Sequence, residues 1–404
     1  MTPAPFLTAN ARWLGAGGVM TFGSCIGQTF FISIFAAQIM ADFGITDGQW
    51  GQLYGAGTLA SGLLMIWAGG LADKFRARNL AILCLCGLAI LATAMAWNRS
   101  VWAIPFIIFG LRLFGQGMLH HSALVAMSRW FVAARGRAIA VSQLGFSLGE
   151  AFLPFAFALM LTQFSWRSLW LLPVIACLVM MPLLHRLLSQ ERTPQSLAAQ
   201  DSTTGMHGLQ WNRPMALRHW LIWSLAPLIM GPSAFGTAFF FQQVHFAGTK
   251  GISHEALTAL FPVYTFSTIG FALIFGAMID RFGASRLLPY IGLPLVVGFL
   301  TLWGAAGLMG LIIGLLFMAL AQGGNGTVLV AFWSEVFGTK HIGSIKAFAT
   351  ALMVIGSAIG PALSGILIDY GITFEAQMPA ISVYFLVSTM ISWAAVRAAR
   401  RSLA

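Results

Sequence analysis

Three polar side chains lie at regular spacing inside one long apolar stretch. Arg112, Gln116 and His120 are four residues apart, which aligns them along one face of an α-helix. If that stretch crosses a membrane from an outer end near Val101, a rise of about 1.5 Å per residue places Arg112 near the midplane. An arginine at that depth costs about 2.5 kcal/mol or more unless it faces water or a partner. Arg112 is therefore a candidate anion clamp or proton-relay partner, with a structural arginine bonded to carbonyls of a neighbouring helix as the alternative.

Glu150 is the second candidate, because it is the only carboxylate well inside an apolar stretch. Gln143, Ser147 and Glu150 are spaced i, i+4 and i+7 and so share a helix face. A low dielectric favours the protonated form of a carboxylic acid, which would let Glu150 carry a proton. Paired with Arg112 it would instead stay ionised and form a structural or gating ion pair, and both interpretations stay open. His120 likewise has two interpretations, proton coupling and packing.

The composition indicates the setting in which these side chains act. The chain has 404 residues, of which 58% are hydrophobic and 8% charged, and its mean hydropathy is +0.84. A soluble protein of this length needs more charged surface, so lipid must surround most of it. Backbone in lipid must be hydrogen-bonded internally, which requires helices of about 20 apolar residues. We predict an all-α membrane protein with twelve transmembrane helices, near 14–41, 51–72, 79–97, 101–128, 137–162, 168–188, 218–246, 257–280, 286–304, 306–333, 344–370 and 377–397.

The distribution of basic residues predicts the orientation. The net charge is +11, but the charges follow the loops between the predicted helices, so we do not expect nucleic acid as a partner. With the N-terminus in the cytoplasm, the outer loops hold Arg99, Arg167 and Lys250, Arg112 lies within a span, and the other Lys and Arg lie inside. This asymmetry places both termini in the cytoplasm. Short outer loops and the lack of a transit peptide favour a bacterial inner membrane.

An internal repeat predicts how the helices are grouped. The segment GGLADKFRAR at 69–78 recurs as GAMIDRFGASR at 276–286, in each case after a long apolar run. Segments 129–138 and 332–347 also correspond, and so do two glycine pairs, Gly145 with Gly149 and Gly356 with Gly360. Three matched features in one order favour two six-helix bundles, 1–188 and 218–404, joined by a cytoplasmic linker at 189–217.

The repeated Gly-x-x-x-Asp-(Lys/Arg) loop resembles the signature between helices 2 and 3 of the major facilitator superfamily. The resemblance covers nearly the whole chain and implies solute transport by rocking of two bundles about a central site. It also implies that the loop residues gate the site, with the aspartates capping a neighbouring helix and pairing with loop arginines. The gating residues carried over on this basis are Asp73, Lys74, Arg78, Asp280, Arg281 and Arg286.

Two further segments resemble particular branches of this superfamily. The residues RWFVAARGRA at 129–138 resemble the monocarboxylate porter and oxalate:formate antiporter branch. The residues RLFGQG at 112–117 resemble the arginine-containing motif in the fourth span of proton-coupled members. Together these resemblances imply an organic anion as substrate and protons as the coupling ion.

The superfamily plan also assigns the residues that would line a cavity. It lines the cavity with spans 1, 4, 7 and 10, and each of these spans here carries polar groups at mid-depth. Such groups either bond helix to helix or face a cavity. Their presence in all four spans favours the cavity, so we expect substrate contacts from Arg112, Gln116, Gln28, Thr237, Gln322 and Asn325.

These observations predict a secondary active transporter of a small organic anion, a monocarboxylate, that is coupled to protons. The alternative is a proton-coupled exporter of amphipathic drugs or metabolites, which the phenylalanine-rich spans and the few cavity charges would also suit. We expect no enzyme activity and no cofactor, because there is no phosphate-binding loop and no nucleophile–base pair. The four cysteines lie in apolar stretches and indicate no metal site. A monomer is expected.

Overall fold

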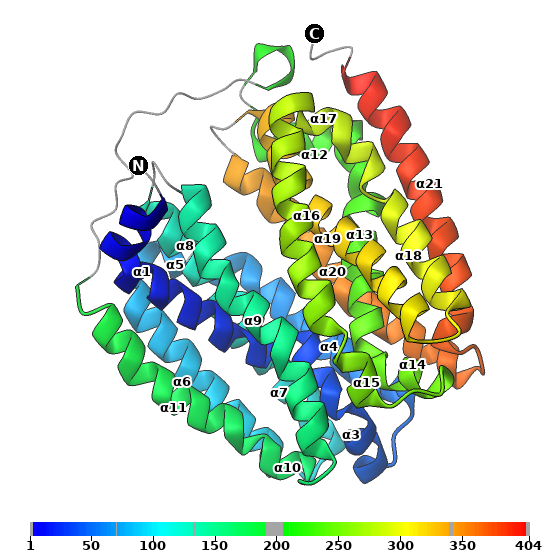
Figure 1. Ribbon diagram of the computed structural model, residues 1–404. Helices are drawn as coiled ribbons and strands as arrows, with labels where there is room; N and C mark the ends of the chain where they lie inside the picture. Colours follow the sequence, from blue (N-terminus) through cyan, green and yellow to red (C-terminus); the bar gives the residue numbers. More distant parts are fainter. Residues whose placement is uncertain are drawn as a thin grey trace. The chain divides into compact units, whose positions relative to one another are not determined.

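The computed structural model describes residues 3–69, 71–131, 135–190, 205–209, 211–338 and 342–400. The chain divides into two compact units of helices, Met1–Ala199 and Gln200–Ala404 (Figure 1).

The first unit begins with a broken helix and continues with long helices. The broken helix comprises α1 (Pro3–Ser24), η1 (Cys25–Gly27), α2 (Thr29–Ile32), η2 (Ser33–Phe35) and α3 (Ala36–Phe43). The following elements are α4 (Asp47–Ala68), α5 (Leu71–Lys74), α6 (Ala77–Ala96), η3 (Val101–Ala103), α7 (Ile104–Leu111), the π-helix η4 (Arg112–Leu119), α8 (His120–Trp130), α9 (Arg135–Leu161), α10 (Trp166–Leu169) and α11 (Leu171–Leu187).

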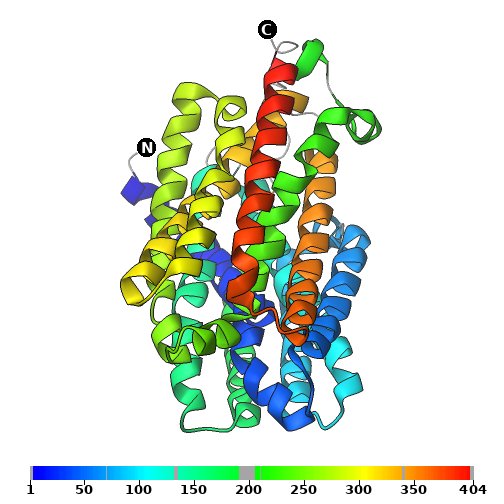
Figure 2. The same ribbon diagram turned by 90° about the vertical axis from the view of Figure 1, so that its right-hand side faces the viewer.

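The second unit begins with two short helices. These are η6 (Met206–Gly208) and α12 (Arg213–Arg218). Then come α13 (Trp220–Phe241), α14 (Gln243–Thr249), α15 (His254–Thr258), α16 (Phe261–Phe282), α17 (Ala284–Leu287), η7 (Leu288–Tyr290), α18 (Leu293–Gly304), α19 (Leu308–Phe337), α20 (Ile342–Asp369) and α21 (Phe374–Arg400) (Figure 2).

These helices account for the predicted spans. Within the described residues, ten helices are long and apolar enough to cross a membrane, and the pair Leu7–Gly27 and Thr29–Phe43, bent by 51°, makes eleven if it is counted as one span. The stretch predicted at 51–72 is α4, whose 22 residues have the length of a span. It is not among those ten helices, and its sequence includes several glycines and two glutamines. Each predicted range thus has a helical counterpart, and the chain is an all-helical membrane protein.

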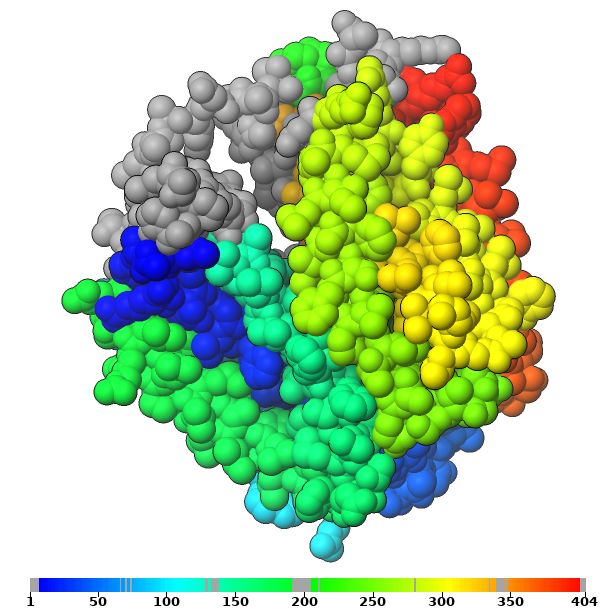
Figure 3. All heavy atoms as spheres, viewed as in Figure 1, coloured from blue at the N-terminus to red at the C-terminus, as the bar shows by residue number. Residues whose placement is uncertain are grey.

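Apolar side chains cover the outside of these helices. Leu273 on α16 is 72% exposed, and the space-filling view shows α16 along one face of the second unit (Figure 3). Exposed tryptophans lie near helix ends, among them Trp97 and Trp102, which flank the turn between α6 and α7. Tryptophan at span ends is typical of the membrane–water interface, so these surfaces are suited to lipid.

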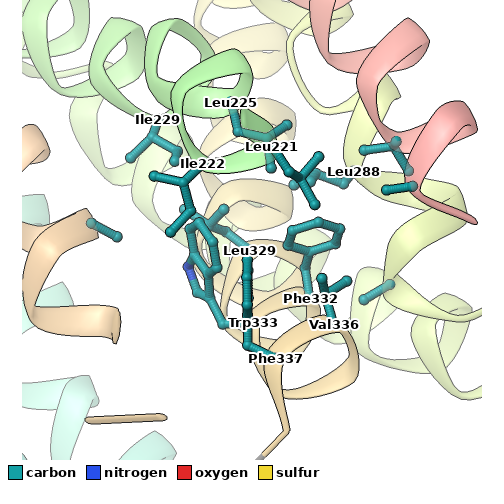
Figure 4. Close-up of a cluster of buried hydrophobic side chains, with 14 of the residues drawn as sticks. Leu221, Ile222, Leu225, Ile229, Leu288, Leu329, Phe332, Trp333, Val336 and Phe337 are labelled. Atoms are coloured by element: carbon teal, nitrogen blue, oxygen red, sulfur yellow. The ribbon is translucent and has the colours of Figure 1, made fainter. Parts of the chain in front are cut away.

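The interior of the second unit includes part of the predicted linker. Trp333 and Phe337 on α19 pack in a cluster with Leu221 and Ile222 on α13 (Figure 4). Trp211, expected in a flexible linker, belongs to the same cluster, and its backbone N–H donates to the carbonyl of Phe337 at 3.2 Å. The end of the predicted linker therefore packs in the core of the second unit, where the Trp211 side chain is buried. Residues 191–204 and 210 lie outside the described residues.

Candidate functional site

The break in the first span lies at Gln28. Its backbone is extended (φ −91°, ψ 153°), and its carbonyl accepts from the N–H of Ile32 at 3.1 Å as α2 begins. Residues 25–29 are buried, which is the condition under which irregular backbone is tolerated at membrane depth. Glycine permits the packing here, because a Cβ on Gly27 would lie 2.1 Å from the carbonyl oxygen of Leu111. The break is thus pressed against the fourth span.

The fourth span is itself irregular where it meets this break. Residues Arg112–Leu119 form a π-helix, and a Cβ on Gly115 would lie 2.7 Å from Gly27 Cα. In a π-helix the hydrogen bonds run i→i+5, so each turn takes more residues than in an α-helix. The predicted α-helical alignment of Arg112, Gln116 and His120 therefore does not apply to this segment. Short π segments inside helices are frequent at functional sites.

Arg112 begins the π segment, and its guanidinium contacts uncharged groups. The side chain is 4% exposed, and Nη1 donates to Thr29 Oγ1 at 3.1 Å. Thr29 Oγ1 is 2.6 Å from the Tyr54 hydroxyl, and the guanidinium carbon lies 5.7 Å from the centre of the Tyr54 ring. Arg112 Nε is buried and has no hydrogen-bond partner in the part of the chain that the structure describes. Three spans thus meet at a buried cation that keeps an unused donor.

Thr29 and Tyr54 were missed by the sequence analysis. Each is a hydroxyl residue within an apolar stretch, and nothing in its spacing links it to Arg112. A search for hydroxyls at the depth of the arginine on the other spans would have included both.

Two of the three predicted glutamines lie in the chain segments just described. Gln28 is buried at the break itself. Gln116 is half-buried in the π segment, and its Oε1 is buried without a hydrogen-bond partner. These amides complete a polar region around the break, which we call the break site: Gln28, Thr29, Tyr54, Arg112 and Gln116.

The candidate proton carriers lie next to the same break. His120 Nδ1 is 3.3 Å from Ser24 Oγ, and its ring meets the Phe146 ring edge to face at 5.3 Å. Glu150 is half-buried on α9. The residue before it, Gly149, packs so closely that a Cβ on this glycine would lie 2.4 Å from Cys25 Sγ. Both residues thus lie beside η1 in the first unit.

The other predicted substrate residues belong to the second unit. Thr237 is half-buried on α13, Gln322 is exposed on α19, and Asn325 on α19 has a buried Oδ1 without a hydrogen-bond partner. The helix of the seventh span is also interrupted at a glutamine, Gln242, whose Nε2 donates to Ser364 Oγ at 3.4 Å. Gln242 was not among the predicted residues.

The predicted gating loops are described in part. The side chains of Asp73, Lys74 and Asp280 lie outside the described residues. Arg78 is half-buried with Nε 3.5 Å from Asn79 Oδ1, Arg281 lies over the Phe282 ring at 5.2 Å, and Arg286 is exposed on α17.

A different carboxylate caps a helix at the second loop. Glu335, near the end of α19, accepts from the backbone N–H groups of Ala284 at 2.8 Å and Ser285 at 3.3 Å. The Ser285 hydroxyl also donates to it at 2.6 Å. Gly283, with φ +80°, makes the turn that presents these amides. Glu335 was not predicted as a gating residue, although an acid at the end of a long apolar run is a signal that the sequence offers.

Comparison with protein families gives the identity of the fold. The model of the Major Facilitator Superfamily matches residues 17–245 and again 223–401. The chain belongs to this superfamily. Its helices and its family make it a transporter and not an enzyme. In the described residues no three His, Cys, Asp or Glu side chains group as a metal site would require.

Solved structures of this superfamily have the same fold. A bacterial homologue of the human lysosomal transporter Spinster, in an inward-facing and unoccupied conformation, matches with a TM-score of 0.71 and 16% identity over 100% of this chain and 99% of that one. The nucleoside transporter NupG matches with a TM-score of 0.66 and 13% identity over 96% and 99%.

One curated relative is similar over part of its length. A gallate transporter of Pseudomonas putida is 24% identical over 163 residues, which are 39% of this chain and 35% of that protein. The match therefore spans about a third of the relative.

Proposed function

We propose that this protein is a secondary active transporter of small organic anions, specifically monocarboxylates, and that protons drive it. Alternating access would expose a site that includes the break site to each side of the membrane in turn. Gating would involve the loop residues Asp73, Lys74, Arg78, Asp280, Arg281 and Arg286, with Glu335 holding the second loop. The protein would act as a monomer in a bacterial inner membrane, with both termini in the cytoplasm.

The observation that carries this proposal is the state of Arg112. Among the described residues, its contacts come from a hydroxyl and an aromatic ring, which carry no charge to balance it. A buried cation without a counter-ion is costly at membrane depth. A carboxylate bound beside Nε would supply the missing charge and could use the planar donor geometry of a guanidinium. The partial similarity to a gallate transporter supports a carboxylate cargo.

Proton coupling is proposed for Glu150, with His120 as the second candidate. Glu150 lies beside the break, where movement of α9 against α1 would change its exposure to water. Such a change alternately favours the protonated and the ionised form of a carboxyl group. This is the property that a carrier of protons needs.

The test uses purified protein in liposomes that contain a pH-sensitive dye. We expect an external carboxylate, such as lactate, benzoate or gallate, to acidify the lumen beyond the leak of protein-free liposomes. Arg112→Gln should weaken apparent affinity on the order of 100-fold, and Thr29→Val, which removes one hydroxyl, about 10-fold. Glu150→Gln should keep carboxylate exchange but lose uptake driven by a proton gradient.

The matched control is Arg99→Gln, which removes an exposed arginine outside the site. All variants are compared after elution as monodisperse protein. Unchanged uptake by Arg112→Gln would refute the anion clamp. If amphipathic cations alone respond, with an acidic lumen becoming alkaline, the protein is the drug or metabolite exporter instead.

A further inference from the structure

A small polar cavity lies at the end of the second unit where α17 and η7 meet α21. Its volume is about 220 Å³, and Arg286, Tyr290, Trp393 and Arg397 are among its lining residues. Arg286 comes from α17, Tyr290 from η7, and the other two from α21. Two arginines from different helices therefore face one cavity.

The Arg397 side chain contacts an aromatic ring, and hydrogen bonds fix the backbone beside Arg286. The Arg397 guanidinium carbon lies 5.1 Å from the centre of the Trp393 ring, a cation–π contact within one turn of α21. Arg286 follows Ser285, whose N–H and hydroxyl are both bonded to Glu335. Glu335 is thereby occupied with the start of α17, and the cavity lining, as far as the structure describes it, contains no carboxylate. The cavity is a positively charged site suited to an anion.

An apolar surface continues from this cavity along the two helices. The exposed apolar side chains include Met390 and Leu386 on α21 and Leu293 and Val297 on α18. The helices α18 and α21 pack side by side, as both ribbon views show (Figures 1 and 2). Met390 is 63% exposed, which is unfavourable in water and suited to lipid chains.

The half-exposed Tyr290 and Trp393 lie between the charged and the apolar part. Aromatic rings with a polar edge favour the level of the lipid headgroups. A cationic cavity, an aromatic level and an apolar surface therefore follow one another in the order of a phospholipid's phosphate, glycerol region and acyl chains.

We propose that this cavity binds the phosphate of an anionic phospholipid whose acyl chains lie along α18 and α21. Basic cavities between membrane helices bind such headgroups because each arginine adds attraction to a negatively charged lipid. The second unit thus has a lipid site that is separate from the break site and does not depend on the transported substrate.

Native mass spectrometry of the purified full-length protein tests this site, with phosphatidylglycerol and phosphatidylcholine added in equal amounts. We expect the wild type to retain phosphatidylglycerol in preference. The double variant Arg286→Gln/Arg397→Gln should lose that preference by on the order of 10-fold. The control Arg213→Gln/Arg218→Gln removes two exposed arginines of α12 and should behave as the wild type.

Equal retention of both lipids by the wild type, or unchanged preference in the double variant, would overturn the proposal. Inorganic phosphate forms a further arm. If it displaces phosphatidylglycerol at comparable concentration, the site recognises a free anion and the lipid assignment is wrong. If the double variant is not monodisperse, the single variant Arg397→Gln gives the same comparison. The Arg397 side chain is exposed and, among the described residues, its contact is the Trp393 ring, so we expect this variant to fold.

Discussion

Single residues in this protein act through neighbours that come from distant parts of the chain. Arg112 could be selected from the sequence because an arginine in an apolar stretch needs a reason to be there. Its partners Thr29 and Tyr54 could not, since hydroxyls in membrane helices commonly bond to their own backbone. Ser33, for example, donates to the carbonyl of Thr29 four residues earlier. Only the fold distinguishes the two uses of a hydroxyl.

His219 provides a prediction at the same scale, outside the membrane spans. Its Nδ1 accepts from the N–H of Leu221 at the start of α13, which requires the unprotonated nitrogen. Burial lowers the pKa of His219, and the nearby His207 lowers it further. Because the folded pKa lies below that of the unfolded chain, protonation favours unfolding, and stability should fall as the pH drops below about 6.5.

The measurement is the melting temperature of the wild type and of His219→Asn between pH 8 and pH 5. Asn keeps a side-chain acceptor for the helix start but does not titrate. We expect the variant to lose part of the decline seen for the wild type at low pH. Parallel pH profiles would contradict this role for His219.

Helices approach each other closely where the repeated glycine pairs lie. In the first unit a Cβ on Gly145 of α9 would lie 2.0 Å from the carbonyl oxygen of Gly18 on α1. In the second unit a Cβ on Gly360 of α20 would lie 2.0 Å from the carbonyl oxygen of Ala234 on α13. One glycine of each repeated pair therefore lets the fifth span of its unit approach the first span closely.

Alanine at these positions should destabilise the unit concerned. We expect Gly145→Ala and Gly360→Ala each to cost about 1 to 3 kcal/mol, because backbone must move to admit the methyl group. The controls are Gly15→Ala and Gly236→Ala, on α1 and α13, where a Cβ would meet nothing within 4 Å. Thermal unfolding in detergent compares the four proteins. A melting temperature lowered equally by controls and variants would show that helix contact is not the cause.

Each unit of the molecule contains an ion pair between the end of its first span and the start of its last span, and the cation and the anion exchange positions between the two units. In the first unit Arg167, at the start of α10, pairs with Asp42 on α3, and its Nη2 donates to the carbonyl of Asn98 at 3.1 Å. In the second unit the cation is at the other position, since Lys250 after α14 pairs with Glu375 on α21 at 2.7 Å. Each cation thus joins the end of a unit's first span, the start of its last span, and the loop before its fourth.

Removal of the Lys250 side chain should lower the stability more than removal of the Arg167 side chain. Its Nζ also donates to the carbonyls of Trp303 at 2.7 Å and Ala305 at 3.1 Å, and its side chain is only 9% exposed. We expect Lys250→Met to lower stability on the order of 2 kcal/mol, as for other hydrogen bonds to charged groups. The double variant Lys250→Glu/Glu375→Lys should recover only part of this lost stability. It keeps an ion pair, but glutamate at position 250 cannot donate to the two carbonyls.

Thermal unfolding and a double-mutant cycle measure both effects. Full recovery by the double variant would show that the carbonyl contacts contribute nothing. An unchanged melting temperature in Lys250→Met would contradict the prediction as a whole.

The membrane setting, the helices and the internal repeat were predicted from the sequence, and Arg112 was selected from it as a candidate site residue. These features depend on the free energy of transferring about 20 neighbouring side chains into lipid. That free energy is a sum over residues that are adjacent in the chain. The break at Gln28, the π segment after Leu111 and the cap by Glu335 were decided by the tertiary structure. They arise where residues far apart in the chain meet, as Gly27 and Gly115 do, and among 44 glycines nothing local marks that pair.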